Sequence, residues 1–373
     1  MASVPQETRR PVPAIQSAAC CPDDRSWDAL VAATPSADPY YRPGYVRAYE
    51  AAGHGRAVAL IVPARNSQFL LPLLLRPVAE VPFLSECPDF DAITPYGYGG
   101  ILRLCGTETI TIDLMGELLQ NIREWCIANN VVSIMLRLHP LLQQASWFLG
   151  DFEGVSLRTT STTIALDTND WDPAKHLITS MHRNRRSDLI FARRYLKLRW
   201  TSEDKAIHEH LTIFRDLYEE RMDELRARDF YHLPPEYYSQ LMDGLAGDAD
   251  IAIAWLNDEP VGAAIFIAGR DFAHYHLSAT NNAGRAYKAS TFLLNAAAGW
   301  AQSRGCRWLH IGGGVSPNDQ LFQFKCRFGG VQLQYSFVTM ILNRERYDRL
   351  VEIHNTAPHL HSPRPDFFPL YRA

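Results

Sequence analysis

The sequence predicts an α/β (α+β) protein with two similar tandem domains, each a mixed, mostly antiparallel sheet flanked by helices. Its 373 residues are more than one hydrophobic core usually organises. Apolar runs of strand length alternate with amphipathic helical patterns, and a comparable order of these elements occurs on both sides of residues 165–173. We therefore expect a flexible leader over residues 1–24, a first domain over 25–170 and a second over 171–373.

The first domain opens with a helical pattern that ends at a glycine, a common C-terminal helix signal. Two apolar runs follow, joined by Asn66 and Ser67 in the manner of a hairpin. The expected elements are a helix over 38–53, strands over 56–65 and 67–78, a turn-dense segment over 93–100, a helix over 109–129 and a strand over 131–142.

The second domain has more helices before its sheet. A prolyl pair starts one of them and Gly247 ends it. A helix over 289–305, between the strands at 271–280 and 306–314, predicts a crossover, and therefore a mixed sheet covered by helices. The expected elements are helices over 176–196, 206–227, 234–247 and 289–305, and strands over 197–202, 250–258, 261–269, 271–280, 306–314 and 331–342.

The net charge, the cysteine content and the longest apolar run limit the kinds of binding partner and the cellular compartment that are expected. A net charge of -4 argues against a general polyanion binder, so contacts to phosphate need a local basic patch. The 7 cysteines include no Cys-x-x-Cys pair, which favours a reducing cytoplasm over a disulfide framework or a zinc ribbon. The densest apolar run, residues 69–75, is far shorter than the roughly 18 residues of a membrane span, so no span is expected.

Several short motifs, taken in their order, resemble the Fem-type (FemABX-like) transferases of the GNAT superfamily. They are "TPYGYGG", "RLHPLL", "RNRRSDLIFA", "LHIGGG" followed by "LFQFKCRFGG", and the closing "FFPLYR". The resemblance implies two GNAT-like domains and transfer of an aminoacyl group from aminoacyl-tRNA to an amine, with no further cofactor. The implied partners are charged tRNA and a peptide-like, nucleotide-linked or carrier-bound amine acceptor.

One departure separates this chain from acetyl-CoA-dependent members of the superfamily. Those enzymes hold pyrophosphate with Arg/Gln-x-x-Gly-x-Gly/Ala at a helix N-terminus. Here Arg285 is followed at that spacing by Lys288 and Ser290, whose side chains hinder a close approach of the backbone. Two alternatives stay open: an acyl-CoA-dependent N-acyltransferase acting on a sugar or polysaccharide precursor, and a non-catalytic binding module.

The catalytic candidate is Lys325, with Phe324 beside it. In the Fem-type pattern the lysine of "FK" stabilises the oxyanion that forms when an ester carbonyl is attacked, and a lysine could also protonate the leaving oxygen. Glycines at 312–314 would let the chain turn sharply at the strand end, and the resemblance places Gly313 and Gly314 at the substrate. The alternative is a solvated lysine on a short helix beside an ordinary turn.

A basic segment is the second candidate site. Seven Lys or Arg residues stand against one acid between residues 183 and 199. A helical reading places Ile178, Met181, Leu189, Ala192 and Leu196 on one stripe, with Arg185 on the stripe and most other basic residues off it. Arg183, Arg185 and Arg186 are thus candidates for binding phosphate, and the alternative is a solvated basic face.

Aromatic and histidine residues complete the candidates. The resemblance implies that Tyr96, Tyr98 and Gly99 border the acceptor site, and the alternative is an ordinary turn. The alternation of the two tyrosines suggests a shared orientation. His276 is expected to pack or hydrogen-bond near the cleft. His274 shares its strand face, but no third ligand with suitable spacing accompanies the pair, so no metal is expected. The chain has no Gly-x-Ser-x-Gly motif, which disfavours hydrolase chemistry.

Overall fold

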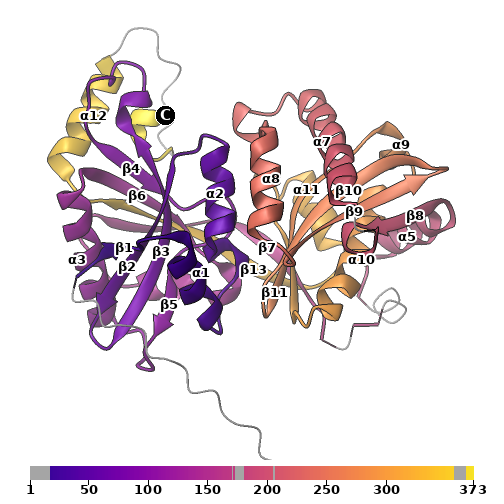
Figure 1. The fold of residues 1–373 in the computed structure, drawn as a ribbon, viewed down its shortest axis with the longest axis horizontal. Coiled ribbons are helices and arrows are strands. Elements are labelled where there is room, and N and C mark those ends of the chain that lie inside the picture. The colour runs from indigo at the N-terminus through magenta and orange to yellow at the C-terminus, as the bar shows by residue number, and fades with distance from the viewer. Residues whose placement is uncertain (1–16, 170, 173–179, 205, 357–366) are drawn as a thin grey trace, which may run out of the picture.

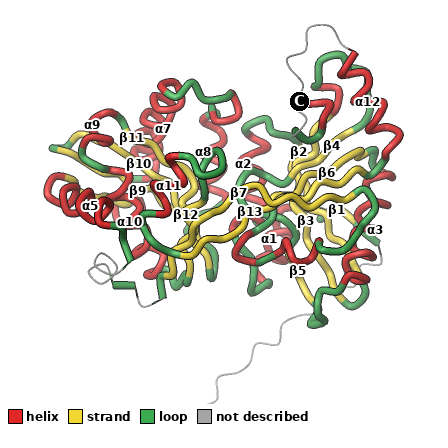
Figure 2. Tube along the Cα trace, turned by 180° about the vertical axis from the view of Figure 1, so that it is seen from behind, coloured by secondary structure: helices red, strands yellow, loops and turns green. Residues whose placement is uncertain are grey.

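The structure is a computed structural model that describes residues 17–169, 171–172, 180–204, 206–356 and 367–373. Over these residues one continuous 13-stranded sheet runs through both halves of the molecule (Figures 1 and 2). Helices cover the sheet on both faces, as expected for an α/β fold. No helix among the described residues has the length and hydropathy needed to cross a membrane.

The first half contains a sheet of mostly antiparallel strands. Its elements are β1 (Ala19–Cys20), α1 (Asp24–Ala33), η1 (Pro39–Tyr41), α2 (Pro43–Ala51), β2 (Arg56–Ala64), β3 (Ser67–Pro77), η2 (Val78–Glu80), β4 (Phe90–Ile93), β5 (Leu102–Cys105), α3 (Ile112–Ala128), β6 (Val131–Arg137), η3 (Pro140–Leu142), η4 (Gln144–Phe148) and β7 (Val155–Asp167). β2 and β3 form the expected hairpin, and β4 runs antiparallel to β3. α3 then crosses over to β6, which is parallel to β4.

The second half repeats this plan. Its elements are α5 (Arg183–Tyr195), β8 (Leu196–Trp200), α6 (Thr201–Asp204), α7 (Ile207–Glu224), η5 (Asp229–Tyr231), α8 (Pro235–Gly244), β9 (Ala249–Leu256), β10 (Glu259–Ala268), β11 (Phe272–Thr280), α9 (Asn282–Ala286), α10 (Ala289–Ser303), β12 (Trp308–Gly312), α11 (Gln320–Cys326), β13 (Val331–Ile341), α12 (Arg344–Thr356) and η6 (Leu370–Arg372). β9, β10 and β11 are antiparallel neighbours, and α10 crosses over to β12, parallel to β11.

The two halves exchange their last strands. β7 follows β6 in the chain but pairs antiparallel with β12 of the second half. β13 follows β12 in the chain but pairs antiparallel with β6 of the first half. β7 and β13 also pair with each other over most of their length, which joins the two sheets. Figure 2 shows these two strands crossing the middle of the molecule. The sheet order is β1-β2-β3-β4-β6-β13-β7-β12-β11-β10-β9-β8, with β5 on β3.

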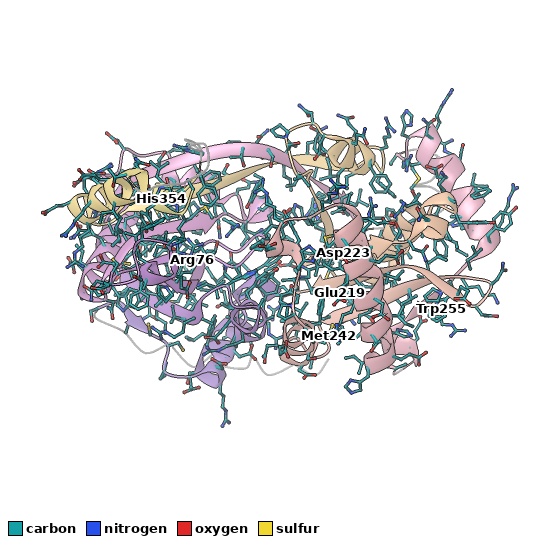
Figure 3. The ribbon with its side chains drawn as sticks, turned by 90° about the horizontal axis from the view of Figure 1, so that it is seen from above. Arg76, Glu219, Asp223, Met242, Trp255 and His354 are labelled. Carbon is teal, nitrogen blue, oxygen red and sulfur yellow. The ribbon has the colours of Figure 1, made fainter. Side chains whose placement is uncertain are left out.

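The C-terminal segment lies with the first half in space. α12 and the last residues pack on β6, where Ser133 Oγ and Tyr371 Oη are 3.0 Å apart. Asp91 is buried between Arg76 and Arg372, whose Nε donates to it at 2.6 Å. Figure 3 shows Arg76 and His354 together on this side, away from the labelled residues of α7 and α8. The division at residue 170 assigns β13 and α12 to the second domain, whereas strand pairing places them with the first.

Helices α2 and α8 pack against each other between the two halves. A Cβ atom at Gly44 would lie 2.1 Å from the carbonyl oxygen of Gly244, closer than any real contact. The two backbones therefore touch at this crossing, which only glycine permits. Around it lies a core of aromatic and aliphatic side chains from both halves, including Tyr45, Tyr49 and Tyr237. This core fixes the relative position of the two halves.

The main differences from the sequence expectation lie in segments with weak patterns. β1 lies inside the expected leader and pairs with β2, and residues 1–16 of that leader lie outside the described part. β7 was not expected, because its sequence is rich in threonine and lacks a regular apolar alternation. The helix expected over 176–196 is described from Arg183, and residues 173–179 lie outside the described part.

Candidate active site

Three glycines, the last residue of β12 and the two that follow it, each meet a separate steric requirement. Gly312 has φ +72°, in the left-handed region that favours glycine. A Cβ atom at Gly313 would lie 2.6 Å from the carbonyl oxygen of Thr162 on β7, and one at Gly314 would lie 2.1 Å from Asp319 Oδ1. The backbone can therefore turn off the sheet edge and pass close to β7 only without these side chains.

Asp319 organises the loop that follows and starts α11. Its carboxylate accepts hydrogen bonds from the backbone N–H groups of Val315 (2.7 Å), Ser316 (3.0 Å) and Phe322 (2.8 Å). The last of these is the N-cap contact of the helix. One side chain thus fixes the loop and sets the direction of α11, which carries the candidate lysine in its last turn.

Lys325 points inward from α11 and is only 8% exposed. Its Nζ donates to the carbonyl oxygen of Gly313 at 2.8 Å and lies 6.0 Å from the centre of the Tyr275 ring. Burial lowers the pKa of Lys325 to about 8, against the opposing effect of Asp319. Lys325 is therefore not a solvated surface charge. Phe324 packs beside it, edge to face with Phe328 at 5.3 Å.

Tyr98 brings the first half of the chain to this lysine. A Cβ atom at Gly312 would lie 3.0 Å from Tyr98 Oη and 3.3 Å from Lys325 Nζ, so both groups flank the same glycine. The Tyr98 hydroxyl takes a backbone hydrogen bond from Gly313, and burial raises the pKa of Tyr98, which keeps the phenol protonated at neutral pH. A cationic donor and a neutral hydroxyl donor thus meet at the junction of the halves.

The other predicted residues lie at varying distances from this centre. Tyr96 is 38% exposed and contacts Phe230 and Tyr231, so the two tyrosines of the motif do not share their neighbours. The intervening Gly97 has φ +108°, which breaks the alternation of an extended chain. Gly99 accepts a hydrogen bond from the Tyr41 hydroxyl at 2.6 Å and has a structural part there.

His276 lies on β11 in the core between the halves. Its Nε2 is 2.7 Å from the Tyr237 hydroxyl on α8. Burial, with a smaller effect from His274, lowers the pKa of His276 to about 3, so the ring is neutral at physiological pH. The expected hydrogen bond of His276 is thus present, and it joins β11 to α8.

A cavity of about 200 Å³ opens beside the glycine loop, between β7, β13 and the loop itself. Its lining is polar and uncharged apart from two apolar side chains. The lining residues are Thr159, Thr160, Ser161, Thr162, Gly314, Ser316, Pro317, Asn318, Phe322 and Gln334. Gly314 follows Gly313, whose carbonyl accepts the hydrogen bond of Lys325, so the cavity borders the glycine loop, although Lys325 itself is not among the lining residues. Sequence patterns gave no signal for it, because β7 itself was not recognised.

The basic helix α5 divides into inward and outward residues. Leu189 and Ala192 are fully buried, as the stripe predicts, whereas Ile178 lies outside the described residues. Arg185 is half-buried: its guanidinium pairs with Asp188 at 2.8 Å and lies 5.0 Å from the centre of the Phe324 ring.

The remaining arginines of α5 face elsewhere. Arg186 is half-buried and donates to the carbonyl oxygen of Met181 at 3.4 Å. Arg183, Arg193 and Arg194 are exposed. Phosphate therefore has access to these three rather than to Arg185, which instead supports the residue next to Lys325.

α5 also packs beside the turn before α10, where the sequence departs from the Arg/Gln-x-x-Gly-x-Gly/Ala pattern. Phe191 and Tyr195 contact Tyr287 in the turn before α10, with ring centres 5.8 and 5.3 Å apart. Arg285, in α9 just before that turn, is paired with Glu224 at 2.9 Å. Lys288 has φ +63° at the start of α10, a conformation that carries strain for a residue with a side chain. Aromatic side chains of α5 thus pack on the turn that leads into α10.

One cluster was missed at the sequence level. Asp38, His139 and His274 come together in the buried centre of the molecule. Their separations along the chain are 101 and 236 residues from Asp38, so no local spacing reveals them. His310 is the register partner of His274 on β12 and packs against Tyr98 with ring centres 4.3 Å apart.

Comparisons with known proteins agree with this architecture. The family model described as "Acetyltransferase (GNAT) domain" matches residues 180–325, which include α5, α10, the glycine loop and Lys325. The structure of FemX superposes with a TM-score of 0.64 at 14% identity, over 88% of this chain and 98% of that chain. No curated protein matches the sequence.

Two further structures share the fold. One is the C-terminal domain (DUF2156) assigned to a lysylphosphatidylglycerol synthetase of Agrobacterium fabrum, with a TM-score of 0.53 at 12% identity over 87% of this chain and 93% of that chain. The other is L-PGS from Bacillus licheniformis, with a TM-score of 0.50 at 13% identity over 82% and 93% of the two chains. The match to residues 180–325 and the superposition on FemX confirm the expected fold: these residues resemble an acetyltransferase (GNAT) domain, and the chain shares the overall fold of FemX.

Proposed function

We propose that the protein is an aminoacyltransferase that moves an amino acid from aminoacyl-tRNA to the amine of a peptide-like or natural-product acceptor and forms an amide bond. The observation that carries the proposal is the buried ammonium of Lys325, held against Gly313 beside the Tyr98 hydroxyl. The fold shared with FemX and with two lysylphosphatidylglycerol synthetase structures supports the choice of an aminoacyl donor.

The reaction requires few groups from the protein. The acceptor nitrogen bonds to the ester carbonyl carbon, the bond from that carbon to the ribose oxygen breaks, and one amine proton ends on the ribose hydroxyl. Lys325 has three N–H groups, of which one is donated to Gly313. The other two can stabilise the oxyanion and protonate the leaving oxygen, with the Tyr98 hydroxyl as a second donor. The pKa of about 8 suits both tasks near neutral pH.

The choice of aminoacyl-tRNA over acetyl-CoA as the acyl donor rests on the contacts around the N-terminus of α10. A coenzyme A pyrophosphate needs free backbone N–H groups there, but Phe191 and Tyr195 contact the preceding turn and Arg285 is neutralised by Glu224. Exposed arginines on α5 offer instead a surface for the phosphates of tRNA. We therefore take charged tRNA as the co-substrate, with no separate cofactor, and the cytoplasm as the site of reaction.

The test compares donors directly. The purified chain is incubated with an amine-bearing peptide mixture and either charged total tRNA or acetyl-CoA, and products are identified by mass spectrometry. We expect a mass gain of one amino-acid residue from charged tRNA. The Lys325→Met variant should lose this product, whereas Lys197→Met, which removes an exposed lysine of β8, should keep it.

Other outcomes select the alternatives. An acetyl gain from acetyl-CoA, with none from charged tRNA, would replace the proposal by an acyl-CoA-dependent transferase. Tight retention of an acceptor without any mass gain would favour a binding module. Equal product from Lys325→Met and the parent chain would remove Lys325 from the mechanism while leaving the donor assignment intact.

A further inference from the structure

A fully buried carboxylate lies between two histidines at the centre of the molecule. Asp38 Oδ2 is 2.8 Å from His274 Nε2 and 3.2 Å from His139 Nε2. The three side chains are at most 1% exposed, and their candidate ligand atoms all lie within 4.8 Å of one another. Three potential metal ligands therefore converge from three separate segments of the fold.

The segments belong to different halves. Asp38 is the N-cap of η1, and His139 follows β6, so both are in the first half. His274 lies on β11 of the second half, beside His310 on β12. Anything held by these three side chains therefore ties the halves together, directly behind the Tyr98 ring, whose centre is 6.4 Å from that of His274.

The separations fit coordination of one ion. With metal bonds of about 2.0–2.1 Å, ligand atoms that subtend 90–109° at an ion lie about 2.8–3.4 Å apart. The observed separations of 2.8 and 3.2 Å fall in this range. Two imidazoles and one carboxylate form a donor set typical of zinc and of ferrous iron, and less suited to calcium or magnesium.

The charge balance also favours a cation. The ion pairs of Asp38 among the described residues are with the two histidines alone, and no lysine or arginine in that part of the chain reaches it. A carboxylate at this depth is unfavourable without a cation or a full set of hydrogen bonds. A divalent ion provides the missing positive charge.

Unpaired nitrogens next to the cluster indicate a missing component. Both ring nitrogens of His310 lack a hydrogen-bond partner among the described residues, although the side chain is only 1% exposed. Its ring centre is 5.6 Å from that of His274. Buried polar groups are nearly always satisfied by protein or ordered water, and a bound ion brings coordinated water to such a place.

We propose that Asp38, His139 and His274 bind one divalent first-row transition ion, zinc or ferrous iron, as a clasp between the two halves. The ion stabilises the junction that presents Tyr98 to Lys325 and has no contact with substrate. This proposal does not depend on the identity of the donor or acceptor. The competing arrangement of the same atoms is an aspartate hydrogen-bonded to both histidines without metal, and the experiment separates the two.

The full-length chain, purified without a histidine tag, is analysed for metals by inductively coupled plasma mass spectrometry. We expect about one equivalent of zinc or iron per chain, removable by a chelator and restored by the metal alone. Cobalt(II) substitution should give visible absorption bands of a nitrogen- and oxygen-ligated site. Thermal unfolding of the chelated protein should move to higher temperature when zinc is added, since the ion binds only the folded state.

Matched variants identify the ligands. His274→Gln and Asp38→Asn should retain less than about a tenth of the metal, because each removes a ligand. His276→Gln, on the same strand two residues away but outside the cluster, should retain all of it. Far-UV circular dichroism confirms that each variant is folded. Absence of stoichiometric metal in the parent chain even after reconstitution, or full metal in His274→Gln, would overturn the proposal.

Discussion

Replacing the buried Lys325 by methionine should change activity and stability in opposite directions. Burial lowers the pKa of this lysine from 10.5 to about 8. A shift of this size corresponds to about 3 kcal/mol of unfavourable free energy when the folded protein carries the charged form. Methionine matches the length of lysine and needs no solvation, but it gives up the hydrogen bond to Gly313, worth about 1 kcal/mol.

The net expectation for Lys325→Met at pH 7 is a gain of about 2 kcal/mol in the free energy of unfolding. The gain depends on pH with a definite sign. Below pH 8 the lysine is charged in both states, so the full penalty applies to the parent chain. Between pH 8 and 10.5 the unfolded state binds more protons than the folded state, and the parent recovers its stability as pH rises. Above 10.5 the advantage of the variant disappears.

Urea unfolding at pH 7 and at pH 10.5 measures the difference in the free energy of unfolding between the parent and Lys325→Met. Ionisable groups present in both proteins contribute equally and drop out of this difference. Amide formation by the variant should fall about 10²- to 10³-fold, the usual loss when one oxyanion donor is removed. Lys197→Met, at an exposed position, should change stability by less than about 0.5 kcal/mol. The reasoning would be refuted if Lys325→Met were less stable than the parent at pH 7, or if the difference in unfolding free energy were the same at both pH values.

Three further variants test other parts of the structure. Gly44→Ala should destabilise the chain by about 1–3 kcal/mol in urea unfolding because its Cβ meets the α8 backbone, whereas Gly116→Ala, which meets nothing, should be neutral or stabilising. Asp319→Ala should lower kcat and cost about 1–2 kcal/mol, since α11 and the glycine loop lose their shared cap. Replacing Arg193 and Arg194 together by alanine should weaken tRNA binding in filter assays and reduce its salt dependence by about one unit of slope for each phosphate that is no longer neutralised; an unchanged slope would remove α5 from the tRNA surface.

The fold was predictable wherever one local pattern dominates. The hairpin at 56–78 is almost wholly apolar, and α3 has a clear buried stripe from Leu114 to Cys126. β7 was missed because its identity depends on pairing with β12 and β13, which are distant in sequence. The exchange of strands between the halves has no local signature for the same reason.

The candidate site divides in the same way. The glycine triplet and Lys325 are close in sequence, so their proximity could be anticipated, and the structure adds the hydrogen bond from Nζ to Gly313. The guanidinium of Arg185 on α5 packs over the ring of Phe324. The positive charge of Arg185 predicted a phosphate contact instead, and nothing in the sequence indicated this packing. The group of Asp38, His139 and His274 depends on three distant segments and could not be found from spacing.

The exchange of β7 and β13 has a consequence for movement during turnover. Because each half completes its sheet with a strand that the other supplies, the lobes cannot swing apart about a linker without breaking backbone ladders on both sides. If the proposed transfer takes place, substrate entry and product release would have to use local displacements rather than a rigid-body opening of the two halves. A fragment cut at the sequence midpoint would leave two incomplete sheets with unpaired edges, and neither half is expected to fold alone.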